Sequence, residues 1–215
     1  EVEQFLQRIE FPYTVGYGAT ECAPIICYAD CHDFVAGSCG KPVVHMEVKI
    51  DSPDPQNVPG EILARGLNVM LGYFKNEEAT AQTIDAEGWY HTGDLGLMDA
   101  DGNVFIKGRS KNMLLGASGQ NVYPEEIEDK LNSLNMVNEC IVAQRGEKLV
   151  GLVYPDFDEA ATMQLNDSDL ENIMEENRQE LNASQPPYCR LAAIEIVKEE
   201  FEKTPKKSIK RYLYK

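Results

Sequence analysis

The spacing of apolar residues changes part-way along the chain, and this change limits the possible folds more than any other feature of the sequence. Before Gly108 the apolar residues mostly alternate with polar ones, whereas after it they recur every three or four residues between short apolar runs. Alternation is typical of half-buried strands, and the longer spacing is typical of amphipathic helices. The sequence therefore predicts an α+β fold, with a β-rich first part and a small α+β domain that begins near Gly108-Arg109.

Strand and hairpin patterns dominate the first part. An alternating run from Val43 to Ile50 predicts a strand, and a short apolar run at 61–64 predicts another. Asp101-Gly102 lies between the apolar runs 95–98 and 104–106, which is a strong hairpin signal. The buried face of the first strand is expected to carry Val44, Met46, Val48 and Ile50.

Helical patterns appear in the second part. Pro124 suits a first helical position, and it precedes an apolar stripe of Ile127, Leu131 and Leu134. Ser168 and Glu171 have the spacing of a capping box at the start of a longer amphipathic helix. Between and after these helices, strands are expected at 140–143, 149–154 and 192–197, the first two forming a hairpin.

The charge balance excludes several classes of partner. The chain has 215 residues, with 20 lysines and arginines against 36 aspartates and glutamates, so its formal net charge is -16. Such a balance disfavours nucleic acid, and no apolar run is long enough to span a membrane. No secretory signal is visible, so a cytoplasmic enzyme is expected. Peripheral contact with a membrane and the oligomeric state stay open, and the absence of an initiator Met suggests a piece of a longer chain.

Four of the six cysteines crowd one stretch, at positions 22, 27, 31 and 39, with His32 beside Cys31. A metal site is one interpretation. The spacings are irregular, however, and no Cys-x-x-Cys pair is present, whereas structural zinc sites hold their ligands on short turns. Reduced thiols that act as small apolar residues are the favoured interpretation.

Three segments carry the residue types that phosphate and ribose chemistry requires. In Tyr17-Gly18-Ala19-Thr20-Glu21 an aromatic ring can stack on a base, glycine lets a backbone approach, a hydroxyl can bond phosphate, and a carboxylate can hold Mg²⁺. In Thr92-Gly93-Asp94 a carboxylate on a turn can accept bonds from a ribose diol, although an ordinary turn explains it equally well. At Gly108-Arg109-Ser110-Lys111 a forked cation coincides with the domain boundary.

Taken in order, these segments resemble the adenylate-forming superfamily of acyl-CoA synthetases, peptide-synthetase adenylation domains and beetle luciferases. The family pattern Tyr-Gly-x-Thr-Glu matches 17–21, Thr-Gly-Asp matches 92–94, and Gly-Arg-x-(Asp/Lys) matches 108–111. The pattern Gly-x-x-(Val/Ile)-x-x-x-Glu-(Ile/Leu)-Glu matches 119–128. The sequence of this segment is most similar to that of medium- and long-chain fatty acid CoA ligases. Shorter matches lie at 37–42, 59–62 and 72–74.

The resemblance implies a domain organisation and a two-step reaction. Residues 1–107 would be the C-terminal part of the large adenylating domain, 108–111 the hinge and 112–215 the C-terminal lid domain. A carboxylate would attack the α-phosphate of ATP to give an acyl-adenylate, and the thiol of coenzyme A would then form a thioester. The implied substrates are therefore ATP with Mg²⁺, coenzyme A and a carboxylic acid, expected to be a fatty acid.

The resemblance also implies roles for residues of this chain. Tyr17 would stack on adenine, the adjoining Gly18 would be a further cofactor-binding residue, Thr20 would contact phosphate, and Glu21 would hold Mg²⁺. In the other motifs, Asp94 and Arg109 would hold the ribose hydroxyls, Lys111 would be the hinge residue, and Gly119 would lie on the segment that lines the pantetheine tunnel.

Two departures from the family pattern stand out. The Ser/Thr/Gly-rich phosphate loop that ends in Pro-Lys-Gly is absent, so the chain is expected to be the C-terminal portion of an enzyme and to be inactive alone. In the basic tail, Ser208 stands where the pattern Pro-Lys-Thr-x-x-Gly-Lys-x-x-Arg has its catalytic Lys, and Lys207 stands where it has Gly. Lys207 is the favoured substitute because lysine is a flexible point charge, with Lys206 and Lys210 as rivals.

Two alternatives remain at this point. An adenylating ligase that loads a carrier protein would differ only in the thiol acceptor. A noncatalytic lid-like binding module is the other alternative, and the displaced tail lysine gives it some weight. The basic tail itself could also be an ordinary solvated tail that binds no anion. The intact residues Glu21, Asp94 and Arg109 favour an enzyme.

Overall fold

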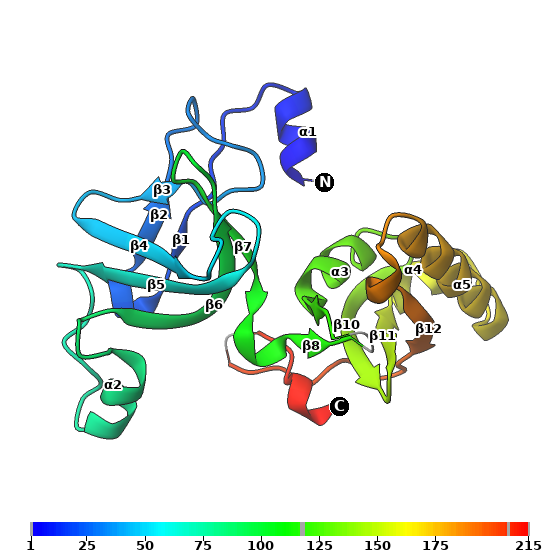
Figure 1. Ribbon diagram of the computed structural model, residues 1–215. Coiled ribbons are helices and arrows are strands. Elements are labelled where there is room, and N and C mark those ends of the chain that lie inside the picture. Colours follow the sequence, from blue (N-terminus) through cyan, green and yellow to red (C-terminus); the bar gives the residue numbers. More distant parts are fainter. Residues whose placement is uncertain (1, 117–118, 206, 215) are drawn as a thin grey trace. The chain divides into compact units, whose positions relative to one another are not determined.

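The computed structural model describes residues 2–116, 119–205 and 207–214, and it shows an α+β chain (Figure 1). The chain divides into two compact units, residues 1–111 and 112–215. The division falls at the end of the segment 108–111, for which the sequence predicts a hinge. No helix of the described residues is long and apolar enough to cross a membrane.

The first unit is built mainly from two antiparallel sheets. One has the strand order β1-β2-β3 and the other the order β4-β5-β6-β7, a meander in which each strand pairs with the next along the chain. The core lies against these sheets and includes the fully buried Ile26, Ile62 and Val104. The elements are α1 (Val2–Arg8), β1 (Tyr17–Gly18), the 3₁₀ helix η1 (Thr20–Cys22), β2 (Ile25–Tyr28), β3 (Lys41–Pro42), β4 (Met46–Asp51), β5 (Gly60–Gly66), α2 (Glu77–Thr83), β6 (Tyr90–Met98), β7 (Val104–Arg109) and the 3₁₀ helix η2 (Ser110–Asn112).

Most strand predictions for this unit are confirmed, and one boundary is wrong. The hairpin around Asp101-Gly102 joins β6 to β7, and Gly60–Gly66 forms the strand expected at 61–64. The strand expected from Val43 begins only at Met46, because His45 has a left-handed backbone (φ 66°) that extended structure does not allow. Val44 is consequently 83% exposed instead of buried.

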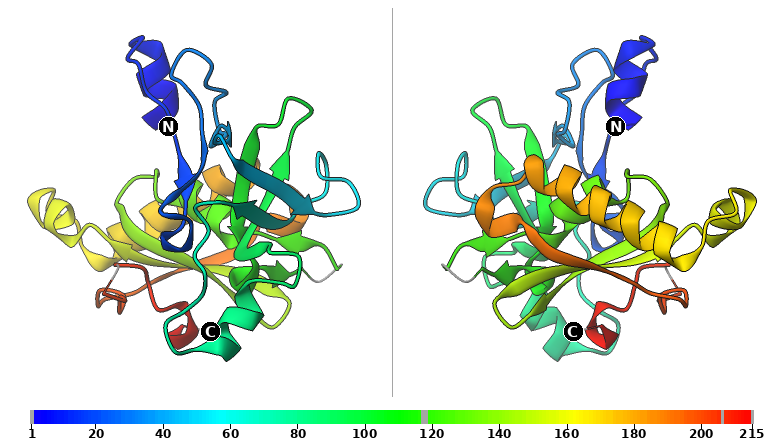
Figure 2. Two further views of the ribbon diagram at one scale, coloured as in Figure 1. Left: turned by 90° about the vertical axis from the view of Figure 1, so that its left-hand side faces the viewer. Right: turned by 90° about the vertical axis from the view of Figure 1, so that its right-hand side faces the viewer.

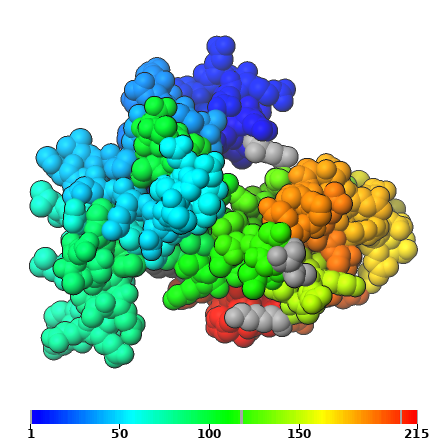
Figure 3. All heavy atoms as spheres, viewed as in Figure 1, coloured from blue at the N-terminus to red at the C-terminus, as the bar shows by residue number. Residues whose placement is uncertain are grey.

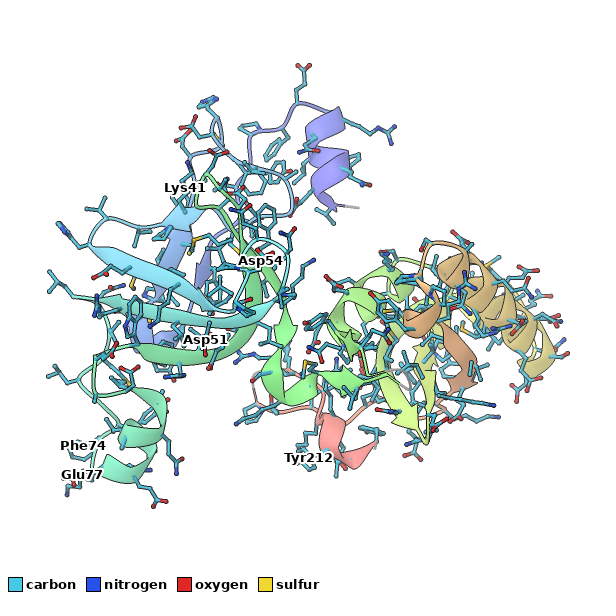
Figure 4. All side chains as sticks on the ribbon, viewed as in Figure 1. Lys41, Asp51, Asp54, Phe74, Glu77 and Tyr212 are labelled. Carbon is cyan, nitrogen blue, oxygen red and sulfur yellow. The ribbon has the colours of Figure 1, made fainter. Side chains whose placement is uncertain are left out.

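The helices of the first unit were not predicted. Helix α2 is capped by Asn76, whose side chain accepts the N–H of Ala79 at 3.0 Å. It forms a protruding lobe of the unit together with the loop before it, as Figure 3 shows. Phe74 lies in the loop before α2 and Glu77 is the first residue of the helix; Figure 4 shows both side chains directed outward, and Phe74 is 89% exposed.

The second unit packs helices against a three-stranded sheet with the order β10-β11-β12. The predicted hairpin of the first two strands is confirmed, and β12 runs parallel to β11 after a helical crossover. Figure 2 shows α5 lying across one face of this sheet. The elements are β8 (Leu114–Leu115), β9 (Asn121–Val122), α3 (Pro124–Leu131), β10 (Val137–Arg145), β11 (Lys148–Pro155), α4 (Phe157–Thr162), α5 (Asp167–Ala183), β12 (Leu191–Ile196) and the 3₁₀ helices η3 (Pro187–Cys189) and η4 (Arg211–Leu213).

Both helix predictions for this unit are confirmed in place but corrected at an end. Helix α3 begins at Pro124 and stops at Leu131, so Leu134 packs against the core from the following turn. Helix α5 is capped by Asn166 and not by Ser168. The Asn166 side chain accepts the N–H of Asp169, and the Asp169 carboxylate accepts the N–H of Asn166, which is the reciprocal pattern of a capping box.

Candidate functional site

The Thr92-Gly93-Asp94 motif lies within β6, beside the end of β7. The strand register places Asp94 directly opposite Arg109, and opposite residues of an antiparallel pair project from the same face. Arg109 Nε lies 2.8 Å from Asp94 Oδ1. Two residues that the sequence predicts to hold a ribose are thus brought together by strand pairing alone.

A third predicted residue meets the same carboxylate. The hydroxyl of Tyr17, on β1, donates to Asp94 Oδ2 at 2.6 Å. Burial raises the pKa of Tyr17, and the neighbouring Asp94 raises it further, so the hydroxyl stays a donor. Both oxygens of Asp94 therefore have a partner, which holds the carboxylate in one orientation. Only 6% of Tyr17 is exposed, and its stacking on adenine stays a prediction.

Hydrogen bonds behind the motif support its backbone. The carboxylate of Glu61 accepts the N–H of Gly93 and contacts His91 Nδ1, each at 2.9 Å. The Thr92 hydroxyl donates to the carbonyl of Ile62 at 2.8 Å and accepts the N–H of Asp94 at 3.0 Å. The sequence assigned no chemistry to Glu61, although it lies in a short stretch that matches the family pattern.

Glycine at position 18 is explained by a close backbone approach within the protein. A Cβ at this position would lie 2.0 Å from the carbonyl oxygen of Pro24, closer than atoms can come. The sequence predicts a close approach at Gly18 to a ligand, but the approach that excludes a side chain is to the chain itself. Gly18 is exposed, so contact with a ligand stays a prediction.

Thr20 and Glu21 lie on the short 3₁₀ helix η1. Thr20 is exposed, and Glu21 is half-buried. The Glu21 carboxylate accepts the hydroxyl of Tyr73 at 2.9 Å, and its backbone carbonyl accepts the N–H of Met70 at 2.7 Å. Tyr73 was not predicted as a site residue. The loop before α2 thus positions the carboxylate for which the sequence predicts Mg²⁺ binding.

In the second unit, Gly119 forms the end of a tight turn between β8 and β9. Its N–H donates to the carbonyl of Gly116, and the N–H of Gly116 donates to the carbonyl of Gln120, both at 2.8 Å. Gly119 has φ +81°, a left-handed conformation that favours glycine. This turn supplies a local reason for the residue, so lining a tunnel is not required to explain it. Ala117 and Ser118, which precede Gly119 in the sequence, lie outside the described residues.

The basic tail forms a hairpin. Lys203 pairs with Ile209 in an antiparallel bridge, and the N–H of Thr204 donates to the carbonyl of Ser208 at 2.8 Å. Lys207, whose N–H donates to the carbonyl of Thr204 at 2.8 Å, has a left-handed backbone with φ 62°. Because the family pattern has Gly at this position, the structure explains that preference: the turn needs a residue with positive φ.

The tail lysines differ in their partners. Lys203 Nζ lies 2.5 Å from a carboxylate oxygen of Glu139, and Lys210 Nζ lies 3.0 Å from one of Glu202. Lys207 is exposed, and no ion pair of its side chain is found within 2–116, 119–205 and 207–214. Lys206 lies outside these ranges. Among the candidate cations that the structure describes, Lys207 is therefore the one whose charge is not already paired.

A buried ion pair joins the tail to the body of the second unit. Glu128, the last residue of the motif at 119–128, is 6% exposed, and its carboxylate contacts the guanidinium of Arg211. The same carboxylate accepts the N–H of Val142, on β10, at 2.6 Å. Burial raises the pKa of Glu128, and Arg211 and the N–H of Val142 oppose that rise. The sequence matched Glu128 and Arg211 to the family without predicting that they meet.

All six cysteines are free thiols, as the sequence favours. Burial raises the pKa of Cys22 to about 11 and that of Cys27 to about 12, so both stay protonated. In the described part of the chain, one group of side chains has the spacing of metal ligands, Asp30-Cys31-His32, with ligand atoms within 4.8 Å of one another. These are consecutive, largely exposed residues of one turn, and such an arrangement does not resemble a structural metal site.

Comparison with known proteins places these motifs in a family. The model of the AMP-binding enzyme family matches residues 1–74, and that of the AMP-binding enzyme C-terminal domain matches residues 111–214. The chain belongs to the AMP-binding enzyme family. The predicted adenylate-forming family is therefore confirmed.

Relatives of this AMP-binding enzyme chain are CoA ligases. The 4-coumarate:CoA ligase 1 of Petunia hybrida is 41% identical over 155 residues, which cover 66% of this chain and 28% of that protein. The 2-succinylbenzoate–CoA ligase of Bacillus cytotoxicus is 39% identical over 147 residues, covering 66% of this chain and 30% of that protein. The chain thus spans less than a third of these relatives. Their names support the CoA ligase class but not the predicted fatty acid branch.

A solved structure confirms the α+β fold of this AMP-binding enzyme chain. The o-succinylbenzoate CoA synthetase of Bacillus subtilis, in complex with the acyl-adenylate intermediate OSB-AMP, matches with a TM-score of 0.78 and 25% identity. The match covers 99% of this chain and 43% of that chain.

Proposed function

We propose that this chain is part of an AMP-forming acid–thiol ligase that activates a carboxylate as an acyl-adenylate and then forms a CoA thioester. The observation that carries the proposal is the arrangement around Asp94. A carboxylate fixed by Tyr17 and Arg109 lies on the Thr-Gly-Asp motif, and a carboxylate held in one orientation suits the two hydroxyls of a ribose.

The remaining site residues are assigned roles in this proposal. Thr20 would bind phosphate, and Glu21 would hold Mg²⁺, because a hard cation prefers carboxylate oxygens. Bound Mg²⁺ would neutralise charge on the phosphates of ATP. Lys111 would be the hinge residue between the two half-reactions, and Gly119 would lie near the pantetheine of coenzyme A.

Lys207 would supply the tail cation of the first half-reaction. This assignment is supported by its exposure and by the ion pairs that already engage Lys203 and Lys210. Transfer at a phosphoryl centre depends mainly on positioning and on neutralising charge, which a lysine can do from a neighbouring position. The assignment also disfavours a noncatalytic module, because the displaced cation has a substitute.

The carboxylate substrate is proposed from the relatives. Their names include 4-coumarate and 2-succinylbenzoate, so we propose an aromatic carboxylate ahead of the fatty acid that the sequence predicts. Coenzyme A is the proposed acceptor for the same reason. A carrier protein is the alternative acceptor, and the same adenylation chemistry would serve either.

The test is ATP–pyrophosphate exchange by the full-length protein with a panel of carboxylates. The panel would contain 4-coumarate, 2-succinylbenzoate and saturated fatty acids of several lengths. Exchange that depends on an aromatic acid supports the proposal, whereas exchange only with fatty acids would reverse the order of substrates. Exchange with none of them, in protein that still binds ATP, would favour the noncatalytic module. A second assay that compares coenzyme A with a carrier protein bearing a free thiol identifies the acceptor.

A further inference from the structure

We infer that Glu139 and Glu128 are positioning residues that hold the tail hairpin, so that Lys207 is presented from a fixed backbone. The tail hairpin consists of two legs, residues 202–205 and 207–211. The inference rests on the proposed function, because it concerns how the cation of the first half-reaction is held. The family pattern contains Glu128 but not Glu139, and it predicts no link between either glutamate and Lys207.

The two legs are joined to each other by backbone hydrogen bonds. The N–H of Lys210 donates to the carbonyl of Glu202 at 2.8 Å, next to the bridge between Lys203 and Ile209. The bond from Thr204 to Ser208 closes the turn at the other end. Lys207 lies within this turn, where its N–H donates to the carbonyl of Thr204, so the position of its backbone depends on the two legs.

Glu139 anchors the first leg. It lies on β10, and its carboxylate approaches Lys203 Nζ to 2.5 Å, with about a quarter of each side chain exposed (25% and 26%). The hydrogen bond to Glu139 raises the pKa of Lys203, which keeps the ammonium charged. Lys203 also lies 3.3 Å from Glu200. The charge of Lys203 is thus used to hold the first leg in place, although from the family pattern alone Lys203 is simply another lysine of the basic tail.

Glu128 anchors the second leg. Its carboxylate lies between the guanidinium of Arg211 and the N–H of Val142, so the leg is tied to α3 and to β10 at one point. The Glu128 side chain is 8% exposed and that of Arg211 is 23% exposed. Water competes little for an ion pair in such surroundings, so the attraction is stronger than that of an exposed pair.

Apolar packing fixes the ends of the hairpin. Phe201, just before the first leg, is 3% exposed and packs edge-to-face on Tyr214, with ring centroids 5.0 Å apart. The Tyr214 hydroxyl accepts the N–H of Glu202 at 2.8 Å. Tyr212, labelled in Figure 4, is 66% exposed and contributes little to this packing. The hairpin is thus held at its base by a small core and along its legs by two ion pairs.

A charge that must be placed to within a fraction of an ångström benefits from a backbone held in this way. Lysine has a long, flexible side chain, so the position of its Cα sets the volume that the ammonium can reach. The displacement of the cation from 208 to 207 makes the anchoring more important, because the ammonium starts from a turn residue with a strained backbone.

The experiment measures the two half-reactions separately in the full-length protein, for Glu139→Gln and Glu128→Gln. Glutamine keeps the shape and an acceptor oxygen in each case but removes the charge that holds the leg. We expect adenylate formation from acid and ATP to fall by roughly tenfold or more. Thioester formation from supplied acyl-adenylate and coenzyme A should stay within about twofold, because the tail cation serves only the first step.

Two comparisons make the test specific. Lys198→Gln breaks an exposed ion pair with Asp167 (2.7 Å) on the same unit but away from the tail hairpin, and it should leave both half-reactions unchanged. Combining Glu139→Gln with Lys207→Ala should slow adenylate formation no further than Lys207→Ala alone, because residues that act through one another are not additive.

The outcomes separate the inference from the proposed function. If Lys207→Ala slows adenylate formation but neither glutamate variant does, the inference fails and the proposed function stands. A parallel loss of both half-reactions that follows a lowered melting temperature would reduce the two glutamates to a structural role and overturn the inference. Absence of adenylate formation in the unmodified protein, with every acid of the panel, would instead remove the proposed function.

Discussion

Asp94 shows how much the chemistry of a residue depends on its neighbours. Its two oxygens contact a buried tyrosine hydroxyl and a guanidinium, and its N–H is held by the Thr92 hydroxyl. An isolated carboxylate on a strand would rotate freely and would bind a diol weakly. Here the orientation is set before any ligand arrives, so little rotational entropy remains to be lost on binding.

Asp94→Asn should therefore weaken ATP binding by the full-length protein. A hydrogen bond to a charged group contributes about 1.5–3 kcal/mol, so we expect the KM for ATP to rise by roughly ten- to a hundredfold. The measurement is the ATP dependence of pyrophosphate exchange. Tyr28→Phe, which removes an exposed hydroxyl elsewhere in the first unit, is a suitable control. An unchanged KM for ATP in the Asn variant would contradict the role of Asp94 in ribose binding.

Replacing Lys207 by glycine is expected to stabilise the protein but to lower its activity. The left-handed backbone of Lys207 costs a non-glycine residue about 1–2 kcal/mol, so Lys207→Gly should raise the free energy of unfolding by about 1 kcal/mol. The same change should slow adenylate formation, because the cation is lost. Urea unfolding of the chain measures the first effect. Lys207→Ala, which keeps the strain, should show no stabilisation, and equal stability of the Gly and Ala variants would count against this explanation.

At the scale of elements, helix α5 offers a test of pH dependence. The guanidinium of Arg178 and the amide of Gln179 hydrogen-bond to Glu175 and lower its pKa to about 2. A carboxyl with a lowered pKa stabilises the folded state above its unfolded value of 4.5, and this contribution is lost as the pH falls toward 2.

Glu175→Gln should consequently destabilise the chain slightly at pH 7, and the difference from the unmodified chain should shrink between pH 4.5 and pH 3. Because the pair is exposed, added salt should reduce the difference as well. Urea unfolding at several pH values measures both trends. A difference that grows as the pH falls would show that the pair does not act in this way.

Element prediction succeeded where the signal is local and failed where the cause lies at a distance. The turn around Asp101-Gly102 and the proline at the start of α3 act within a few residues, and both were predicted correctly. The predicted start of β4 was wrong because His45 has a left-handed backbone, which ends extended structure there. The alternation of apolar residues continues past His45 and gives no sign of this change. The true cap of α5, Asn166, was missed because Ser168 offers the same chemistry two residues later.

At the scale of the whole molecule, these 215 residues carry the Thr-Gly-Asp motif and the basic tail but not the phosphate loop of the family. We therefore predict that the chain expressed alone releases no pyrophosphate from ATP and a carboxylate. The assay compares the chain with the full-length protein at equal concentration. Measurable release by the chain alone would show that the phosphate loop is dispensable for adenylate formation.

The sequence by itself determined the α+β class, the order of the motifs and the family. Turn chemistry, apolar periodicity and motif spacing are local signals, each contained in a short stretch of residues. Only the tertiary structure decided which residues meet. Tyr17 and Asp94 lie 77 positions apart, and Glu128 and Arg211 lie 83 apart. Such contacts depend on strand register and on the packing of a shared core, which no local pattern specifies. For the same reason, the sequence placed Glu128 in a recognised motif but did not reveal that its partner is Arg211 of the tail.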